Sequence, residues 1–300
     1  MTGRRSGLVG ITRRTRRRRF VTADDSVTRS DSGRWSAEGM ALGALFVLVG
    51  LLGVAYGARS WFPELASRHG AGIDAMLNYL LVSTGGLFLV GHLVLGLFIW
   101  QGSRRQRVSR RSATPRAERR LSVGLGMLMA LIAEGGVLAI GIPVWGEYYM
   151  SDTPDDAVVI EVTGTQFMWH ARYPGPDGQF GRLRPELIDS ASNPIGLDAD
   201  DRRAADDVVW TGEVYAPVDR TILIRLRSTD VIHSFFVPSL RVKQDVVPGM
   251  TPDVQFVATR EGRFDIACAE LCGLGHYRMQ GFFNVVTDTE FDRWLREQGS

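Results

Sequence analysis

Long runs of apolar residues dominate the first half of the chain. They cover residues 39–58, 75–100 and 121–145, and the second run contains no Asp, Glu, Lys or Arg. A helix needs about 20 apolar residues to cross a bilayer, so each run is long enough to be a transmembrane helix. The first run fits either a retained span or the core of a long signal peptide, and its length favours a retained span. The pattern predicts a membrane section over residues 35–150.

The second half changes to the alternating pattern of β-strands. Short segments rich in β-branched and aromatic residues, bounded by Gly, Pro and Asp, lie at residues 157–164, 165–173, 207–216, 220–228, 253–261, 262–269 and 279–287. Seven or more short strands predict an all-β sandwich or barrel. A long polar insertion, 174–207, interrupts the series. Thr287 and Glu290 have the spacing of a capping box, which predicts a short helix at the C-terminus.

Charge is distributed unevenly over these two halves. Residues 1–150 hold 20 Arg and nine acidic residues, whereas residues 151–300 hold 15 basic and 24 acidic residues. The basic segment 1–34 lacks an apolar period, which predicts a disordered cytoplasmic tail. A basic segment can also bind nucleic acid, but the apolar membrane runs that follow disfavour this alternative. Eight Arg lie in 101–120 but only two in 58–74. The positive-inside rule therefore places 101–120 in the cytoplasm and residues 151–300 outside it.

Soft metal ligands are concentrated near residue 270. The side chains of this kind within twelve residues are Cys268, Cys272, His276 and Met279. A further imidazole, His233, lies upstream, and such ligands select copper or zinc over hard cations. A blue single-copper site uses one Cys, so two Cys instead indicate two coppers bridged by both sulfurs, each completed by one His and one weak ligand. Met279 and the carbonyl oxygen of Glu270 are candidates for the weak ligands.

Simpler explanations exist for each of these residues. Two Cys four positions apart outside the cytoplasm can form a disulfide, two Cys and two His can hold zinc, and a lone Met is usually a core residue. The usual spacing pairs of zinc sites are absent, and the residues lie in a β-rich context, so copper is the stronger hypothesis. A function of another class with the same ligands is copper delivery, in which one Cu(I) is carried and passed on.

The order of these residues is similar to that of a known family. The chain resembles cytochrome c oxidase subunit II in the motif Cys268-x-Glu270-x-Cys272-x3-His276-x2-Met279 and in the segments His233-Ser-x-x-x-Pro238 and Lys243-x-Asp245-x-x-Pro248 before it. The resemblance covers about residues 75–295. It implies a cupredoxin, a Greek-key β-barrel or sandwich, behind two membrane spans, with an extra apolar segment in front of them.

The resemblance also implies a ligand set and a role. A dinuclear CuA centre would be held by His233, Cys268, Glu270 through its carbonyl, Cys272, His276 and Met279, and the Glu270 side chain would also help hold magnesium at the boundary with subunit I. In a bacterial cell membrane, the chain would pass electrons from cytochrome c to the haem–copper subunit I, which reduces oxygen to water alongside other oxidase subunits. Quinol oxidases lose the copper ligands, whereas the CuA subunit of a nitric oxide reductase stays an alternative. No Cys-x-x-Cys-His motif occurs, so the donor is expected to be a separate protein.

Two expectations concern contact with the donor. Where the family has Trp-Tyr-Trp, this chain has Phe167-Met168-Trp169, so the first Trp, which receives electrons in the family, is replaced by Phe. In a strand, Phe167 and Trp169 would share a face, with Phe167 as the exposed contact and Trp169 packed beneath it. The negative outer domain predicts attraction of a basic cytochrome c. The candidate docking patch is the acidic stretch Asp198, Asp200, Asp201, Asp206 and Asp207.

Overall fold

The computed structural model describes residues 28–59, 62–104 and 114–299. Most of the predicted basic tail, residues 1–27, lies outside the described residues. Residues 28–34, which the sequence analysis assigned to that tail, instead form the beginning of the first helix. The chain divides into two compact units, which are Met1–Leu52 with Leu89–Ser112 and Gly53–Phe88 with Ala113–Ser300.

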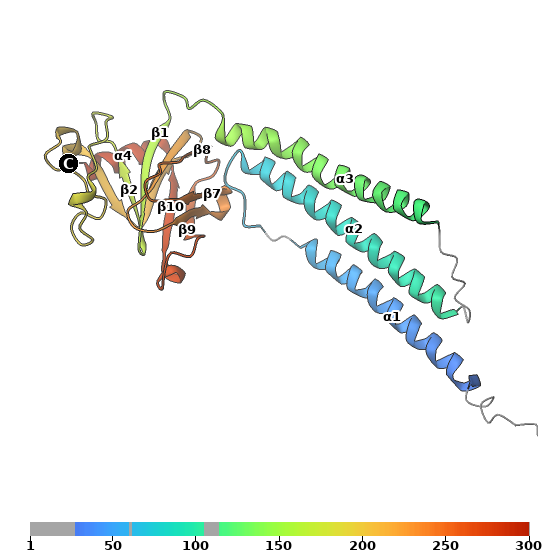
Figure 1. Ribbon diagram of the computed structural model, residues 1–300. Coiled ribbons are helices and arrows are strands. Elements are labelled where there is room, and N and C mark those ends of the chain that lie inside the picture. Colours follow the sequence, from blue (N-terminus) through green and yellow to red (C-terminus); the bar gives the residue numbers. More distant parts are fainter. Residues whose placement is uncertain (1–27, 60–61, 105–113, 300) are drawn as a thin grey trace, which may run out of the picture. The chain divides into compact units, whose positions relative to one another are not determined.

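The described residues include three long helices that come before the β domain in the sequence (Figure 1). They are α1 (Thr28–Gly57), α2 (Gly70–Arg104) and α3 (Pro115–Tyr149). A segment of each is long and apolar enough to cross a membrane: Ala37–Gly57, Gly70–Gly102 and Pro115–Tyr149. Each predicted apolar run therefore corresponds to a helix long and apolar enough to span a membrane.

Within the first unit, α1 and α2 approach each other at two glycines. A Cβ atom on Gly43 would lie 2.9 Å from the carbonyl oxygen of Gly96, and a Cβ atom on Gly96 would lie equally close to the carbonyl oxygen of Gly43. Small residues allow helix backbones to come this close in a membrane. On the same two helices, the rings of Phe46 and His92 lie 5.9 Å apart. The polar His92 therefore faces a neighbouring helix.

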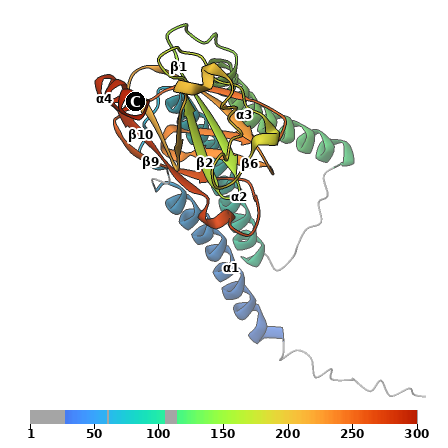
Figure 2. The same ribbon diagram turned by 90° about the vertical axis from the view of Figure 1, so that its left-hand side faces the viewer.

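In the described part of the second unit, ten strands form two five-stranded sheets (Figures 1 and 2). The sheet orders are β3-β2-β1-β5-β8 and β4-β10-β9-β6-β7. The strands are β1 (Val158–Thr165), β2 (Met168–Tyr173), β3 (Val208–Thr211), β4 (Glu213–Pro217), β5 (Thr221–Ser228), β6 (His233–Val237), β7 (Val242–Val246), β8 (Asp253–Val257), β9 (Gly262–Cys268) and β10 (Gln280–Val286). β1 pairs with β5 and β4 with β10 in parallel. The two-sheet domain confirms the predicted all-β cupredoxin architecture.

The C-terminal helix α4 (Asp288–Gln298) begins as the sequence predicts. The side chain of Thr287 accepts a hydrogen bond from the backbone N–H of Glu290, and the Glu290 side chain accepts one from the backbone N–H of Thr287. This reciprocal pair satisfies two N–H groups that the first helical turn leaves free. The predicted capping box is confirmed.

The strands predicted from the sequence differ from those of the structure in two places. The segment 207–216, predicted as one strand, is two strands in different sheets, because Gly212 turns the chain between β3 and β4 with a φ of 83°. Glycine adopts such positive φ values without the clash that a Cβ atom causes. β6 and β7 were not among the predicted strands. Nearly every residue of β6 is buried, so this strand lacks the alternation that marks a half-exposed one.

The insertion 174–207 connects β2 to β3 and is held by carboxylates. Asp198 is 1% exposed and pairs with Arg182, and the Asp207 side chain is buried in an ion pair with Arg172 of β2. Two more members of the acidic stretch accept backbone N–H groups within the insertion, namely Asp201 and Asp206. Four of the five carboxylates are therefore engaged in folding the insertion. The docking role of this stretch stays a prediction.

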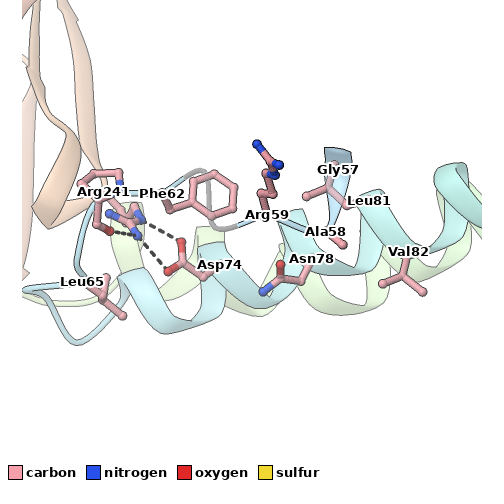
Figure 3. A pocket seen from close by; sticks show the side chains of 11 residues that line it. Gly57, Ala58, Arg59, Phe62, Leu65, Asp74, Asn78, Leu81, Val82 and Arg241 are labelled. Atoms are coloured by element: carbon pink, nitrogen blue, oxygen red, sulfur yellow. Dashed lines mark hydrogen bonds and ion pairs between the residues drawn. The ribbon is translucent and has the colours of Figure 1, made fainter. Parts of the chain in front are cut away.

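One arginine joins the sandwich to α2 within the second unit (Figure 3). The Arg241 guanidinium donates hydrogen bonds to both carboxylate oxygens of Asp74, at 2.7 and 3.0 Å. Two further N–H groups donate to the carbonyl oxygens of Pro238 and Pro63 at 2.6 and 2.9 Å. A fork of donors shared by a carboxylate and two carbonyls restricts the side chain to one orientation. Arg241 thus connects the loop after β6 to the start of α2.

Candidate metal centre

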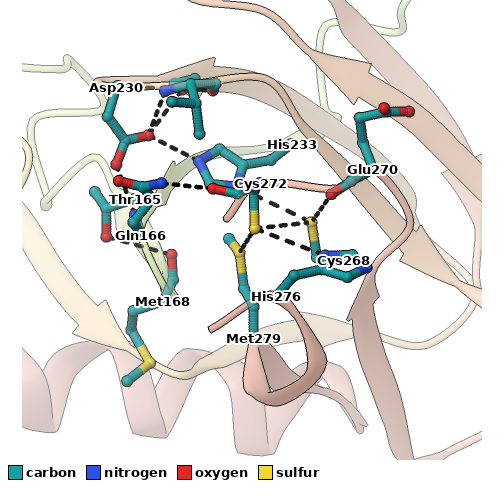
Figure 4. A network of polar contacts seen from close by, with 12 residues as sticks. Thr165, Gln166, Met168, Asp230, His233, Cys268, Glu270, Cys272, His276 and Met279 are labelled. Carbon is teal, nitrogen blue, oxygen red and sulfur yellow. Dashed lines mark hydrogen bonds and ion pairs between the residues drawn. The ribbon is translucent and has the colours of Figure 1, made fainter. Parts of the chain in front are cut away.

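The candidate ligands converge where β6 begins and β9 ends (Figure 4). His233 is the first residue of β6, and Cys268 is the last residue of β9. The two strands are antiparallel with Phe235 opposite Cys268, so the first residue of β6 and the last residue of β9 lie at the same end of the two strands. The backbone N–H of Ala269 donates to Ser234 O at 3.0 Å and extends this pairing. Residues 269–279, called the ligand loop below, supply the other candidates.

The candidate metal ligands of β6, β9 and the ligand loop point toward one another (Figure 4). The two Sγ atoms of Cys268 and Cys272 lie 3.8 Å apart. Each has an imidazole Nδ1 beside it, that of His233 at 4.0 Å from Cys268 and that of His276 at 3.7 Å from Cys272. Met279 Sδ lies 3.6 Å from the Cys272 sulfur. The predicted ligand side chains are therefore brought together in one cluster.

The carbonyl oxygen of Glu270 completes this cluster, 3.1 Å from the Cys268 sulfur. The Glu270 side chain is exposed, so backbone and side chain of this residue have different surroundings. This separation fits the expectation that only its carbonyl belongs to the copper site.

The two sulfurs are too far apart for a disulfide, whose S–S bond is about 2.05 Å, and both Cys are free and buried. Burial raises the pKa of the Cys272 thiol to about 11, with a further contribution from Cys268. A thiolate here needs a positive charge to stabilise it, and metal binding supplies one. Two soft sulfurs, two imidazoles and a thioether are donors that copper prefers. The donor set therefore fits copper.

A carboxylate outside the predicted set orients His233. His233 is fully buried, and its Nε2 lies 2.8 Å from Asp230 Oδ1. When Nε2 carries the proton and donates to Asp230, Nδ1 is left as a lone pair facing the sulfurs. Burial would raise the pKa of Asp230, but hydrogen bonds from His233 and from the N–H groups of Val231 and Gln166 outweigh it, and the pKa is lowered.

Gln166 links the same carboxylate to the ligand loop. Its backbone N–H donates to Asp230 at 2.6 Å, and its side-chain Nε2 donates to Cys272 O at 2.5 Å. These two hydrogen bonds connect the turn between β1 and β2 to the partner of His233 and to the backbone of Cys272. Sequence analysis missed Asp230 and Gln166 as site residues. The position of Asp230 three residues before His233 was the available sign, since a histidine ligand commonly has a carboxylate partner.

The two candidates for electron input lie differently from the expectation. β2 begins at Met168, so Phe167 lies in the turn before the strand, and the prediction that it shares a strand face with Trp169 is wrong. Phe167 is half-buried against the ligand loop, where a side chain on Gly275 would collide with its ring. Trp169 is 1% exposed and packs against the rings of His233 and Phe235, at 5.9 and 5.4 Å. Trp169 therefore packs in the core, as expected.

Comparison with known proteins identifies the family. Residues 158–286 match the family model described as cytochrome c oxidase subunit II, periplasmic domain. The alternative cytochrome c oxidase subunit 2 of Bradyrhizobium diazoefficiens is 33% identical over 264 residues, which cover 86% of this chain and 92% of that protein. This chain belongs to the cytochrome c oxidase subunit II family.

Other members of the subunit II family are also similar. Cytochrome c oxidase subunit 2 of Synechocystis is 29% identical over 269 residues, covering 83% of this chain and 79% of that protein. The crystal structure of the periplasmic domain of subunit II of cytochrome oxidase of Bradyrhizobium japonicum is 29% identical, covers 49% of this chain and 96% of that chain, and aligns with a TM-score of 0.36. Together with the three apolar helices, the family makes this subunit II a membrane protein with a copper-binding cupredoxin domain.

The role of Asp230 in this subunit II can be tested by substitution. We expect Asp230→Ala to weaken copper binding by about 10- to 100-fold, because the His233 ring loses the partner that holds its tautomer and orientation. Competition with a chelator of known affinity measures this. Asp253→Ala, at an exposed carboxylate paired with Arg225 on β5, is the matched control and should bind copper normally. Wild-type affinity in Asp230→Ala would contradict the assigned role.

Proposed function

We propose that this subunit II is the electron-input subunit of a bacterial cytochrome c oxidase. It accepts electrons from a cytochrome c and passes them to the haem–copper subunit I, where oxygen is reduced to water. The observation that carries the proposal is the pair of buried sulfurs 3.8 Å apart, each with an imidazole Nδ1 beside it. A blue single-copper site needs one thiolate fewer.

The proposed cofactor is a dinuclear CuA centre. Its ligands are His233, Cys268, Cys272, His276, Met279 and the carbonyl oxygen of Glu270. When bound, the two coppers supply a one-electron carrier in which the charge is shared between the metals. The exposed Glu270 side chain does not belong to this copper-ligand set, and we propose that it helps hold Mg²⁺ together with subunit I.

The residues around the site keep it rigid and dry. Asp230 and Gln166 fix His233 and the Cys272 carbonyl through three hydrogen bonds. Trp169 packs against the His233 ring, and Phe235 packs against Trp169 in turn. A buried, packed environment limits how far ligands move and excludes water. These contacts favour a ligand geometry that changes little when the site gains or loses an electron.

The proposed orientation follows from the loop charges. The Arg-rich segment 101–120 would face the cytoplasm, and the domain over 151–300 would lie on the extracytoplasmic side of the cell membrane. Residues 35–150 would form the membrane section beside the other oxidase subunits. An extracytoplasmic position makes the domain accessible to a cytochrome c outside the cytoplasm.

Metal content tests the proposal directly. The purified full-length protein is expected to hold two coppers and to show an electron paramagnetic resonance spectrum in which one unpaired electron couples to both copper nuclei. Zinc, or one copper with a single-nucleus spectrum, would reject the dinuclear site. A single Cu(I) transferred rapidly to a chelator would instead indicate copper delivery.

Phe167 is the proposed residue through which electrons enter. Its ring lies against Gly273 and Gly275 of the ligand loop, and the neighbouring Gln166 bonds to Cys272. We expect Phe167→Ala to slow reduction by cytochrome c several-fold without changing the copper spectrum, because a void replaces the packed ring. Stopped-flow reduction measures the rate. A wild-type rate in this variant, together with a slower rate in Trp169→Phe, would move the input point to Trp169.

A further inference from the structure

A cavity of about 400 Å³ lies between the end of α1 and the beginning of α2, within the second unit (Figure 3). Deeper in the helices the two are in contact, since a Cβ atom on Gly53 would lie 3.1 Å from the ring of Phe88. At Gly57, the last residue of α1, an added Cβ atom would meet no heavy atom of the described residues within 4 Å beyond its own turn of helix. The two helices therefore diverge toward their connecting loop. We call the wedge between them the interhelix cavity.

The interhelix cavity lies at a membrane boundary. The candidate spans of α1 and α2 end at Gly57 and begin at Gly70, so the loop side of the cavity is beside the ends of both spans. The opposite side is lined by Leu81 and Val82 of α2, which are 44% and 76% exposed. From Gly70 to Val82 a helix rises about 18 Å, which exceeds the ~5 to 8 Å of one headgroup layer. The cavity therefore reaches from headgroup level into the hydrocarbon.

One positive charge in the interhelix cavity has no partner in the described part of the chain. The two acidic residues of the loop between α1 and α2 are both neutralised by the β domain, Glu64 by Arg260 and Asp74 by Arg241. Arg59 lines the cavity and forms no side-chain hydrogen bond or ion pair with a described residue. The cavity therefore carries the net charge of one guanidinium, which favours an anion.

The other lining side chains indicate what kind of anion fits. An arginine forms two parallel hydrogen bonds with a phosphate group, and Asn78 adds an amide N–H donor from α2. Beyond these polar groups, Leu81 and Val82 offer an apolar surface that a free anion would leave unused. A membrane helix of another subunit would have to continue past the point where Gly53 meets Phe88, which is closed. A phosphate group attached to an acyl chain that leaves past Val82 meets neither restriction.

We propose that the interhelix cavity binds an anionic glycerophospholipid, with its phosphate on Arg59 and the first carbons of an acyl chain along Leu81 and Val82. A zwitterionic lipid is disfavoured because the one carboxylate among the described lining residues, Asp74, is already paired with Arg241 and is not available to a headgroup ammonium. The lipid would fill the wedge and join the two helices at this end. The proposal is independent of the copper site, so either can fail without the other.

Lipid titration tests this on the purified oxidase containing the full chain, in a non-ionic detergent. Mass spectrometry of the intact complex counts the lipids bound at each concentration. Dioleoylphosphatidylglycerol should occupy one tight site per chain, and dioleoylphosphatidylcholine should bind there about tenfold more weakly. Arg59→Gln should weaken binding of the phosphatidylglycerol about tenfold, since it removes a charge-assisted contact. Arg68→Gln makes the same charge change in the same loop, at an exposed side chain outside the cavity, and should bind normally.

A second variant tests the place of binding rather than the charge. Ala58 lines the cavity and is exposed, so a larger side chain there can occupy the space without entering the protein core. Ala58→Phe should abolish the tight site while the copper content and the subunit composition stay those of the wild type. If Ala58→Phe does not assemble, the comparison of Arg59→Gln with Arg68→Gln still decides.

Five outcomes would overturn the proposal. Unchanged binding in Arg59→Gln, or equal affinity for the two lipids, would exclude selection by this arginine. Tight binding that survives in Ala58→Phe would place the lipid elsewhere. Displacement by inorganic phosphate at the concentration of the lipid would identify the ligand as a free anion. A Val82→Cys variant that cross-links to the catalytic subunit would show that protein covers the cavity. A mature chain whose intact mass lacks the residues before Ala58 would lack one wall of the cavity altogether.

Discussion

Cys268→Ser and Cys272→Ser are each expected to abolish the shared-electron copper spectrum. Each sulfur has its own imidazole, and the two sulfurs lie 3.8 Å apart, so loss of either removes a bridge between the two metal positions. Ser is close to Cys in size, so the sandwich should stay folded. Copper analysis and paramagnetic resonance on the full-length protein measure the loss, and near-ultraviolet circular dichroism reports the fold.

Met279→Leu is the matched control for the cysteine variants. Met279 is also buried in the cluster, but as a weak ligand it should alter the midpoint potential more than the copper content. A shared-electron spectrum that survives in either cysteine variant would contradict bridging by both sulfurs. Equal loss of copper in Met279→Leu and the cysteine variants would contradict the weak role of the thioether.

Arg172→Met is expected to lower the free energy of unfolding by about 3 to 5 kcal/mol. Arg172 is buried and forms ion pairs with Glu161 of β1 and Asp207 at the end of the insertion, and it also donates to Gly181 O. Removing the guanidinium leaves the buried Asp207 side chain without a cation, and it leaves Glu161 only the more distant Arg225, at 3.9 Å. Guanidinium chloride unfolding of the full-length protein in detergent measures the change.

The pH dependence of this loss provides a second check. Burial already raises the pKa of Asp207, while Arg172 works against that rise. Without Arg172 the folded-state pKa rises further, so the folded protein binds a proton more readily than the unfolded chain. The penalty should therefore shrink as the pH falls toward that pKa.

Arg220→Met is the control for the arginine substitution. It removes a partly exposed ion pair with Asp288, for which a loss of about 1 kcal/mol or less is expected. If Arg172→Met lowers the free energy of unfolding by no more than Arg220→Met does, the buried ion pairs of Arg172 contribute little to stability.

Local patterns in the sequence were enough to predict the membrane helices, the C-terminal helix and most strands. These elements are predicted from apolar runs, from the Thr287–Glu290 spacing and from the alternation of apolar and polar residues. Each pattern involves residues only a few positions apart, and so do the interactions that form the element. The soft ligands of the loop fall within twelve residues, so their grouping was also visible, and their order matched a family motif.

The tertiary structure decided how these pieces meet. Gly212 divides one apparent strand between two sheets, and Phe167 falls in a turn that ends against the ligand loop. Gln166 bonds to Asp230 and to the Cys272 carbonyl, which are 64 and 106 positions away. Such contacts arise from the pairing of distant strands, which alternation along one strand does not encode. Likewise, the acidic stretch of the insertion looked free in sequence, but folding pairs four of its five carboxylates with nearby arginines and N–H groups. Sequence alone therefore predicted the candidate ligands, and long-range strand pairing determined what holds them in place.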